Sequence, residues 1–269
     1  MSFSLSSTFP HHKPLIAMIH VPALPGTPAY RNNWPAVLKK VQEEAELLTA
    51  AGVDVLLLEN MHDTPYSART VGPEIVSSMT AVALAVKNIA PHLPCGIQVL
   101  AGANQAALAV ALAADLQFIR AEGFVFGHLA DEGWMNSDAA DLLRYRRNIG
   151  AEHIAVFTDI KKKHSAHAAT ADVSLAETAK AAHFFRTDGL IVTGTATGSE
   201  AKPEDLAAVK KACPELPLLV GSGISPENVE QYLPYADAFI VGSALKKEGH
   251  WANELDTGRV EKMVAALAK

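Results

Sequence analysis

Short apolar segments alternate with longer segments of helical periodicity along almost the whole chain, and this alternation restricts the fold more than any other feature. Each apolar segment is rich in Val, Ile and Leu and leads through a polar or Gly-containing loop into an Ala-rich helical segment. Strands that alternate with helices in this way form parallel βαβ units. The expected strands lie at residues 15–20, 53–58, 96–100, 118–120, 153–158, 190–193, 218–220 and 238–241.

The segments between these strands have the length and spacing of helices. We expect them at residues 34–51, 72–90, 104–114, 137–149, 174–186, 203–212, 226–233 and 257–268. Eight strands and eight helices spread over 269 residues favour a closed barrel, because such barrels run to about 250 residues as one domain. The first turn, Pro22 to Gly26, lacks the G-x-G-x-x-G spacing of an open dinucleotide-binding sheet. We therefore predict an α/β protein with a short N-terminal extension, residues 1–13, and one (β/α)8 TIM barrel over residues 14–269.

The composition supports a large core and argues against several classes of protein. Hydrophobic residues make up 49% of the chain, which argues against disorder. The net charge of −6 predicts no nucleic-acid partner, although a small anion could bind a local basic pocket. No apolar segment approaches the ~20 residues of a membrane span, and residues 1–13 lack the apolar core of a signal peptide. Cys95 and Cys213 have no metal-type spacing and indicate free thiols, so we expect a cytoplasmic protein.

Polar side chains gather where the expected strands end. The opposite ends of the strands carry mostly Gly, Pro and Asp turn residues. In (β/α)8 barrels the loops after the strands build the active site. The strand-end set consists of His20, Glu59, Asn60, Gln98, Arg120, Glu122, Asp159, Thr193, Ser222 and Ser243. This set predicts a ligand site at the C-terminal ends of the strands.

Glycines follow the sixth, seventh and eighth expected strands. Glycines in these loops let backbone N–H groups turn inward, and a short helix beyond the seventh strand would add partial positive charge. Many barrels hold a phosphate group in this way. The alternative is that the glycines serve only tight turns. We predict a phosphate site at Gly194, Gly221, Ser222, Gly223, Gly242 and Ser243.

Charged residues at the strand ends are candidates for catalysis. Glu59 follows an apolar run and is either a general base, a metal ligand or the partner of Arg120 in a structural ion pair. Arg120 and Glu122 lie two apart on one strand face, so they either pair with each other or leave Arg120 to bind an anion. Asp159 closes the fifth strand. His20, which closes the first strand, is either functional or structural.

Three consecutive lysines follow Asp159. A lysine beside an aspartate can transfer protons or hold an anion, whereas a lysine run in a loop is often simply solvated. Lys161 or Lys163 could also form a Schiff base. The predicted catalytic set is Glu59, Asp159, Lys161, Arg120, Glu122 and His20. No standard zinc spacing occurs, so we predict no metal and no other cofactor, with a divalent ion on Glu59 and Asp159 left open.

The loop at residues 124–134 combines glycine with aromatic residues. That composition suits either a mobile lid or a packed surface loop.

Several strand-end segments together resemble the BtpA family, which includes the SgcQ-type proteins. They are IAMIHVPALPG at 16–26, GVDVLLLEN at 52–60, RAEG at 120–123, VFTDIKKKH at 156–164, VTGTATG at 192–198, LVGSG at 219–223 and FIVGS at 239–243. The resemblance implies a barrel related to the ribulose-phosphate-binding group. It further implies either a role in photosystem I biogenesis or stability, or, as in SgcQ-type proteins, a place beside sugar uptake and sugar kinases with a nucleosidase description. It implies no catalytic assignment for individual residues.

Two functional hypotheses follow from the residues and the resemblance. The first is an enzyme that binds a small phosphorylated metabolite, a sugar or nucleoside-type compound. Its reaction is either glycosidic cleavage by the carboxylates of Glu59 and Asp159, or isomerisation or aldol-type cleavage. The second is a non-enzymatic assembly or stability factor for a membrane complex. The Ala-rich outer helices would permit a homo-oligomer in either case.

Overall fold

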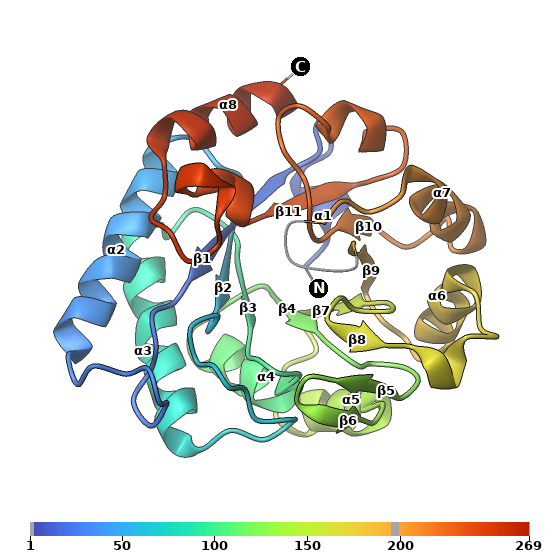
Figure 1. Cartoon of the computed structure of the whole chain (residues 1–269), viewed down its shortest axis with the longest axis horizontal. Helices are drawn as coiled ribbons and strands as arrows, with labels where there is room; N and C mark the ends of the chain where they lie inside the picture. Colours follow the sequence, from blue (N-terminus) through green and yellow to red (C-terminus); the bar gives the residue numbers. More distant parts are fainter. Residues whose placement is uncertain (1–2, 195–198, 269) are drawn as a thin grey trace.

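Eight parallel strands form a closed barrel surrounded by helices (Figure 1). This computed structural model describes residues 3–194 and 199–268. Around the barrel the strands follow the order β1-β2-β3-β4-β7-β9-β10-β11, and β11 pairs with β1 to close it. The predicted (β/α)8 fold is therefore confirmed. No helix among the described residues is long and apolar enough to cross a membrane.

Every predicted strand forms, with its ends shifted by at most two residues. The barrel strands are β1 (Leu15–His20), β2 (Val55–Glu59), β3 (Cys95–Gln98), β4 (Phe118–Ala121), β7 (Ala155–Asp159), β9 (Gly189–Val192), β10 (Leu218–Val220) and β11 (Ala238–Val241). Their side chains alternate between two apolar clusters. Along β1, Leu15, Ala17 and Ile19 pack outward against the helices, whereas Ile16 and Met18 fill the barrel interior. Burial on both faces explains why the strands appear as continuous apolar runs.

The outer layer consists of seven α-helices among the described residues. They are α2 (Trp34–Ala50), α3 (Pro73–Ile89), α4 (Asn104–Ala113), α5 (Ala139–Asn148), α6 (Leu175–Phe184), α7 (Pro203–Ala212) and α8 (Thr257–Leu267). The α-helix predicted at 226–233 is wrong, because only the 3-10 helix η2 (Val229–Tyr232) forms there. Pro226 and Pro234 bracket this segment and leave too few residues for a regular α-helix.

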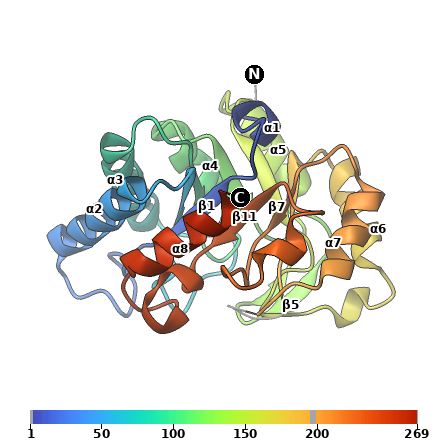
Figure 2. The same cartoon turned by 90° about the horizontal axis from the view of Figure 1, so that it is seen from above.

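The N-terminal extension closes one end of the barrel. Its short helix α1 (Leu5–Thr8) inserts Leu5 into the interior cluster, and the ring of Phe3 stacks on Phe118 with centroids 5.7 Å apart. Figure 2 shows α1 at the end of the barrel opposite β5. The extension thus covers the N-terminal ends of the strands.

The glycine and aromatic loop at 124–134 is folded into a hairpin. Strands β5 (His128–Ala130) and β6 (Gly133–Met135) pair with each other, and β8 (Ser165–Ala166) adds to the edge of β5. This small sheet joins the loop after β4 to the loop after β7. It therefore holds the backbone after the lysine run, whereas β7 of the barrel holds the backbone before it.

Candidate functional site

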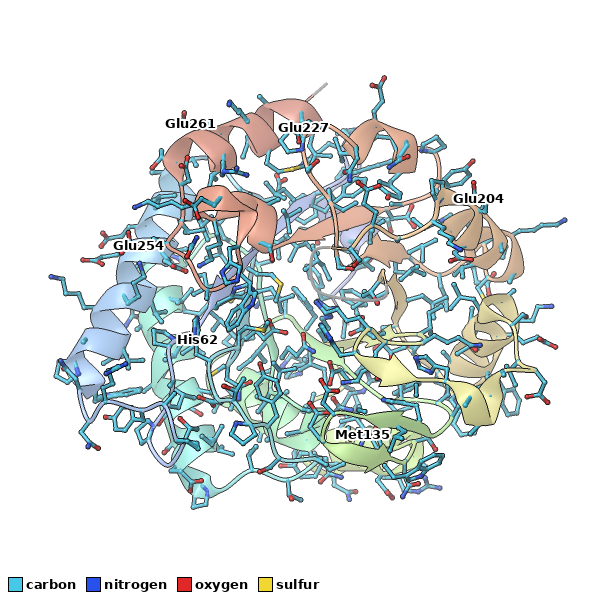
Figure 3. The ribbon with its side chains drawn as sticks, in the orientation of Figure 1. His62, Met135, Glu204, Glu227, Glu254 and Glu261 are labelled. Carbon is cyan, nitrogen blue, oxygen red and sulfur yellow. The ribbon has the colours of Figure 1, made fainter. Side chains whose placement is uncertain are left out.

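A cavity of about 250 Å³ opens at the C-terminal ends of the barrel strands. It lies over β1, β2, β10 and β11, and Figure 3 shows the side chains that converge on this end, with His62 on the loop after β2. The predicted site residues that line it are His20, Glu59, Gly221, Ser222, Gly223, Gly242 and Ser243. Residues from strands far apart in the chain thus meet in one cavity.

The loops after β10 and β11 present unused backbone donors. The N–H groups of Gly223, Ile224, Ser243 and Ala244 donate to no other described residue. Gly223 has a φ of +71°, and a Cβ there would lie 2.3 Å from the carbonyl oxygen of Ser199. Only glycine fits this position without displacing the neighbouring backbone. The two loops form the polar wall of the cavity.

Gly194 and Ser222 support this wall from behind. The N–H of Gly194 donates to Ser222 Oγ at 2.9 Å, and that hydroxyl donates to the carbonyl of Ser199 at 3.2 Å. Gly194 itself does not line the cavity. Its N–H is already used within the protein, so the structure separates Gly194 from the other glycines of the predicted phosphate site.

Sequence reasoning missed several polar side chains that line the cavity, among them Arg259, Asn228 and Glu200. Arg259 lies in the first turns of α8, and one of its nitrogens, Nη1, lies 3.4 Å from the carbonyl oxygen of Ala244. The start of a helix that follows a barrel strand faces the same end as the strand terminus. An arginine there was therefore a usable signal. Asn228 binds the backbone of Ser225 and Gly223 and so fixes the shape of the loop after β10.

Arg120 pairs with Asp159 instead of with Glu122 or Glu59. Arg120 Nε donates to Asp159 Oδ2 and Nη2 donates to Oδ1, both at 2.8 Å, and both side chains are buried. Burial alone would lower the pKa of Arg120, but the carboxylate of Asp159 outweighs burial and raises it. Both oxygens of Asp159 are therefore occupied, and this carboxylate is not free to exchange protons with a ligand.

Glu59 faces the cavity beside a neutral histidine. Glu59 Oε2 lies 3.7 Å from Nε2 of His20, whose Nδ1 lies 3.0 Å from the carbonyl oxygen of Trp251. Burial lowers the pKa of His20 to about 3, and because a carbonyl only accepts, Nδ1 carries the hydrogen. Burial also raises the pKa of Glu59, although Arg120 and Lys163 oppose this. Burial thus favours the protonated form of the Glu59 carboxyl group.

Glu122 lies in a separate buried network. Its Oε1 accepts from Gln98 Nε2 at 3.1 Å, and its Oε2 pairs with Lys162 Nζ at 3.3 Å. Lys162 lies 4.0 Å from Glu132 as well. Glu122 does not line the cavity, so the structure does not bring it to the other candidates.

The lysines at positions 161–163 lie in different surroundings. The amine of Lys161 donates to the carbonyls of Thr170 and Val173, away from the cavity. Lys163 lines the cavity, where burial and the charge of Arg120 lower the pKa of its amine. Of the two lysines considered from the sequence, the structure brings Lys163 to Glu59 and leaves Lys161 outside.

The described residues contain no group of three or more His, Cys, Asp or Glu side chains placed to hold a metal ion. The acidic pair Glu59 and Asp159 does not form such a group, and Asp159 is engaged by Arg120. The predicted divalent-ion alternative therefore has no support from this geometry.

Solved structures with a similar shape contain the same barrel. Orotidine 5'-monophosphate decarboxylase from Methanocaldococcus jannaschii, complexed with the inhibitor BMP, superposes with a TM-score of 0.60 at 14% identity. The match covers 96% of this chain and all of that chain. At this identity the likeness shows the fold alone.

The sequence similarity to known proteins extends over almost the whole chain. A mitochondrial protein of Caenorhabditis elegans is 52% identical over 257 residues, which cover 94% of this chain and 92% of the relative. The photosystem I biogenesis protein BtpA of Synechocystis is 33% identical over 265 residues, 98% of this chain and 91% of the relative. The BtpA family model matches residues 11–269. The chain therefore belongs to the BtpA family.

Proposed function

We propose that this protein is an enzyme that acts on a small phosphorylated sugar or nucleoside-type metabolite. One observation carries the proposal: unused backbone N–H groups on the loops after β10 and β11 share a cavity with Arg259, Glu59 and Lys163. Backbone donors and an arginine suit a phosphate group. The cavity of about 250 Å³ is smaller than the ~300–1,000 Å³ typical of drug-sized ligands, so it fits a small metabolite.

Within this proposal the phosphate contacts Gly223, Ile224, Ser243, Ala244 and Arg259. The reacting part of the substrate then extends toward β1 and β2. Glu59 is the acid/base residue there, because its carboxyl group lines the cavity with no hydrogen bond to another described side chain. Lys163 and Arg120 stabilise negative charge that develops on the substrate.

The proposed reaction is proton transfer at carbon, as in isomerisation or aldol-type cleavage. Glycosidic cleavage by two carboxylates requires both groups to be free for proton transfer or attack. Both oxygens of Asp159 accept hydrogen bonds from Arg120, so of this predicted pair only Glu59 remains available. Asp159 is then a positioning residue for Arg120.

The name of one solved neighbour adds support at the level of fold. Orotidine 5'-monophosphate decarboxylase acts on a phosphorylated nucleotide and uses a barrel of the same shape. Barrels commonly bind phosphate groups at the loops after the last two strands. The proposal assigns the same use to these loops here.

Thermal-shift measurements against sugar phosphates and nucleotides, paired with their unphosphorylated counterparts, test the proposal. We expect the phosphorylated compounds to stabilise the protein and the counterparts to have little effect. Arg259→Leu should weaken binding about tenfold to hundredfold, since a charged hydrogen bond contributes about 1.5–3 kcal/mol. Lys262→Leu, an exposed change on the same helix, is the matched control. If phosphorylated compounds bind no better than their counterparts, the proposal fails.

A second candidate function is that of an assembly or stability factor. The photosystem I biogenesis protein BtpA is a relative, and this chain carries an apolar groove of about 480 Å³ along α5 and the end of α6. Phe184 in this groove is 83% exposed, and three arginines, Arg144, Arg147 and Arg186, line it. Such a groove suits a partner segment with an apolar side chain and carboxylates.

Genetic rescue separates the two candidates. In a strain of the source organism that lacks this protein, the enzyme proposal expects Arg259→Leu to fail and the double variant Phe184→Ser with Phe185→Ser to restore growth. The assembly proposal expects the opposite pattern. Both changes lie at exposed or cavity positions, so both variants should fold.

A further inference from the structure

One lysine amine differs from the other cations near the cavity. Lys161 donates to backbone carbonyls, Lys162 pairs with Glu122, and Arg120 is held by Asp159. The amine of Lys163 makes no hydrogen bond or ion pair to another described residue, although this residue lines the cavity. Its amine is therefore available to a ligand.

We propose that Lys163 is a nucleophile that forms a Schiff base with the carbonyl group of an open-chain phosphorylated aldose or ketose. The inference rests on the proposed phosphate site, since the phosphate would hold the substrate in the cavity that Lys163 lines. In this inference Lys163 forms a covalent bond to the substrate, in place of only stabilising its negative charge. It also restricts the substrate class to compounds with a free carbonyl group.

The surroundings of Lys163 favour the reactive form of its amine. A lysine must be neutral to attack a carbonyl carbon, and a desolvated lysine beside another cation loses its proton more readily. Lys163 is half-buried, and desolvation together with the charge of Arg120 lowers the pKa of its amine. The carboxylates of Glu59 and Asp159 oppose this effect, but the net direction is downward.

The loop that carries Lys163 is anchored on both sides. It begins after Asp159, the last residue of β7, and ends at β8, whose Ser165 and Ala166 pair with Ala130 and Leu129 of β5. A nucleophile needs such a fixed backbone to keep its amine aligned with the substrate.

Glu59 can supply and remove the protons that imine formation requires. The lone pair of Lys163 Nζ attacks the carbonyl carbon, and the carbonyl oxygen takes a proton from Glu59. Glu59 then moves a proton from the attacking nitrogen to this hydroxyl, which leaves as water and gives an iminium ion. In total a neutral amine, a carbonyl and one proton give an iminium ion and one water. The iminium ion accepts the electron pair of an adjacent C–H or C–C bond. The Glu59 carboxylate takes the proton released from that carbon or from the hydroxyl beside the broken bond.

Reductive trapping tests the inference. The full-length protein is incubated separately with D-glyceraldehyde 3-phosphate, dihydroxyacetone phosphate and ribose 5-phosphate, and sodium borohydride is then added. We expect intact-mass measurement and peptide mapping to find a reduced adduct on Lys163 with at least one probe. Lys163→Arg keeps the positive charge but removes the nucleophile, and the adduct should disappear. Lys161→Arg is the matched control and should retain it, because Lys161 points away from the cavity.

The outcomes distinguish this inference from the function on which it rests. If the phosphorylated probes stabilise the protein but no adduct forms at Lys163, or if Lys163→Arg shows the same adducts as the unmodified protein, the Schiff base is excluded and the phosphate site stands. If neither inorganic phosphate nor the probes stabilise the protein, the proposed function fails as well. An adduct confined to Lys163 supports both.

Discussion

The guanidinium of Arg120 and the carboxylate of Asp159 form a bidentate ion pair, with both hydrogen bonds at 2.8 Å. Arg120 comes from β4 and Asp159 from the neighbouring β7, so the pair ties two barrel strands together. A Cβ on Gly221 would lie 3.1 Å from Arg120 Nη2, which places the guanidinium directly behind the loop after β10. The pair thus engages both oxygens of Asp159, whereas Glu59 lines the cavity.

Breaking this pair should destabilise the fold strongly. Asp159→Ala leaves a buried guanidinium without its partner, and we expect a loss of about 3–5 kcal/mol in the free energy of unfolding measured with urea. The double variant Arg120→Met with Asp159→Leu removes both charges and should lose clearly less. A loss for Asp159→Ala within the ~0.5 kcal/mol of ordinary surface changes would contradict the buried pair.

Glu59 should make the protein less stable as the pH rises. Its pKa is raised in the folded state by burial, so the folded protein binds a proton more tightly than the unfolded chain. The resulting stability is complete below the ordinary pKa of about 4.3 and is lost as the pH rises through the raised value. We expect unfolding measured from about pH 4 to about pH 8 to show a decline that Glu59→Gln removes. If the unmodified protein gains stability relative to Glu59→Gln as the pH rises, the pKa of Glu59 is lowered on folding and not raised.

His20 should remain neutral and in one tautomer well below neutral pH. Burial lowers its pKa to about 3, so the stability it contributes is present above the unfolded pKa of about 6.5 and is lost as the pH falls toward the folded value. Nitrogen NMR of the imidazole at about pH 5 should show hydrogen on Nδ1 only, with His20→Gln to assign the signal. A doubly protonated ring at that pH would contradict the lowered pKa of His20.

The N-terminal extension should stabilise the barrel without affecting the ligand. Leu5→Ala removes a side chain that is 3% exposed in the interior cluster, and we expect a loss of about 2–5 kcal/mol by urea unfolding. Ser6→Ala, at an exposed position of the same helix, is the control. Binding of sugar phosphates below the unfolding transition should not change, because α1 lies at the other end of the barrel. Weaker phosphate binding in Leu5→Ala would show that the two ends are coupled.

The continuous apolar runs identified all eight barrel strands because a strand buried on both faces leaves its pattern in consecutive residues. The helix expected at 226–233 did not form, since local spacing looked helical while Pro226 and Pro234 limited its length. The residue at which an apolar run stops, and with it the end of a strand, can also be identified from neighbouring residues in the sequence. For this reason the sequence located His20, Glu59 and the glycine loops at one cavity.

Side-chain partners depend on distances between strands that sequence spacing does not contain. The two-residue spacing of Arg120 and Glu122 suggested a pair, but Arg120 reaches across to Asp159 on β7 and Glu122 turns to Gln98 and Lys162. Lys161 and Lys163 have the same type of side chain in one loop, and only the path of that loop toward β8 decides which amine enters the cavity. The sequence by itself determined the barrel and the residue types gathered at the C-terminal ends of its strands. The tertiary structure decided which charges neutralise one another and which remain for a ligand, because Coulomb and hydrogen-bond energies depend on atomic distances set by the closed sheet.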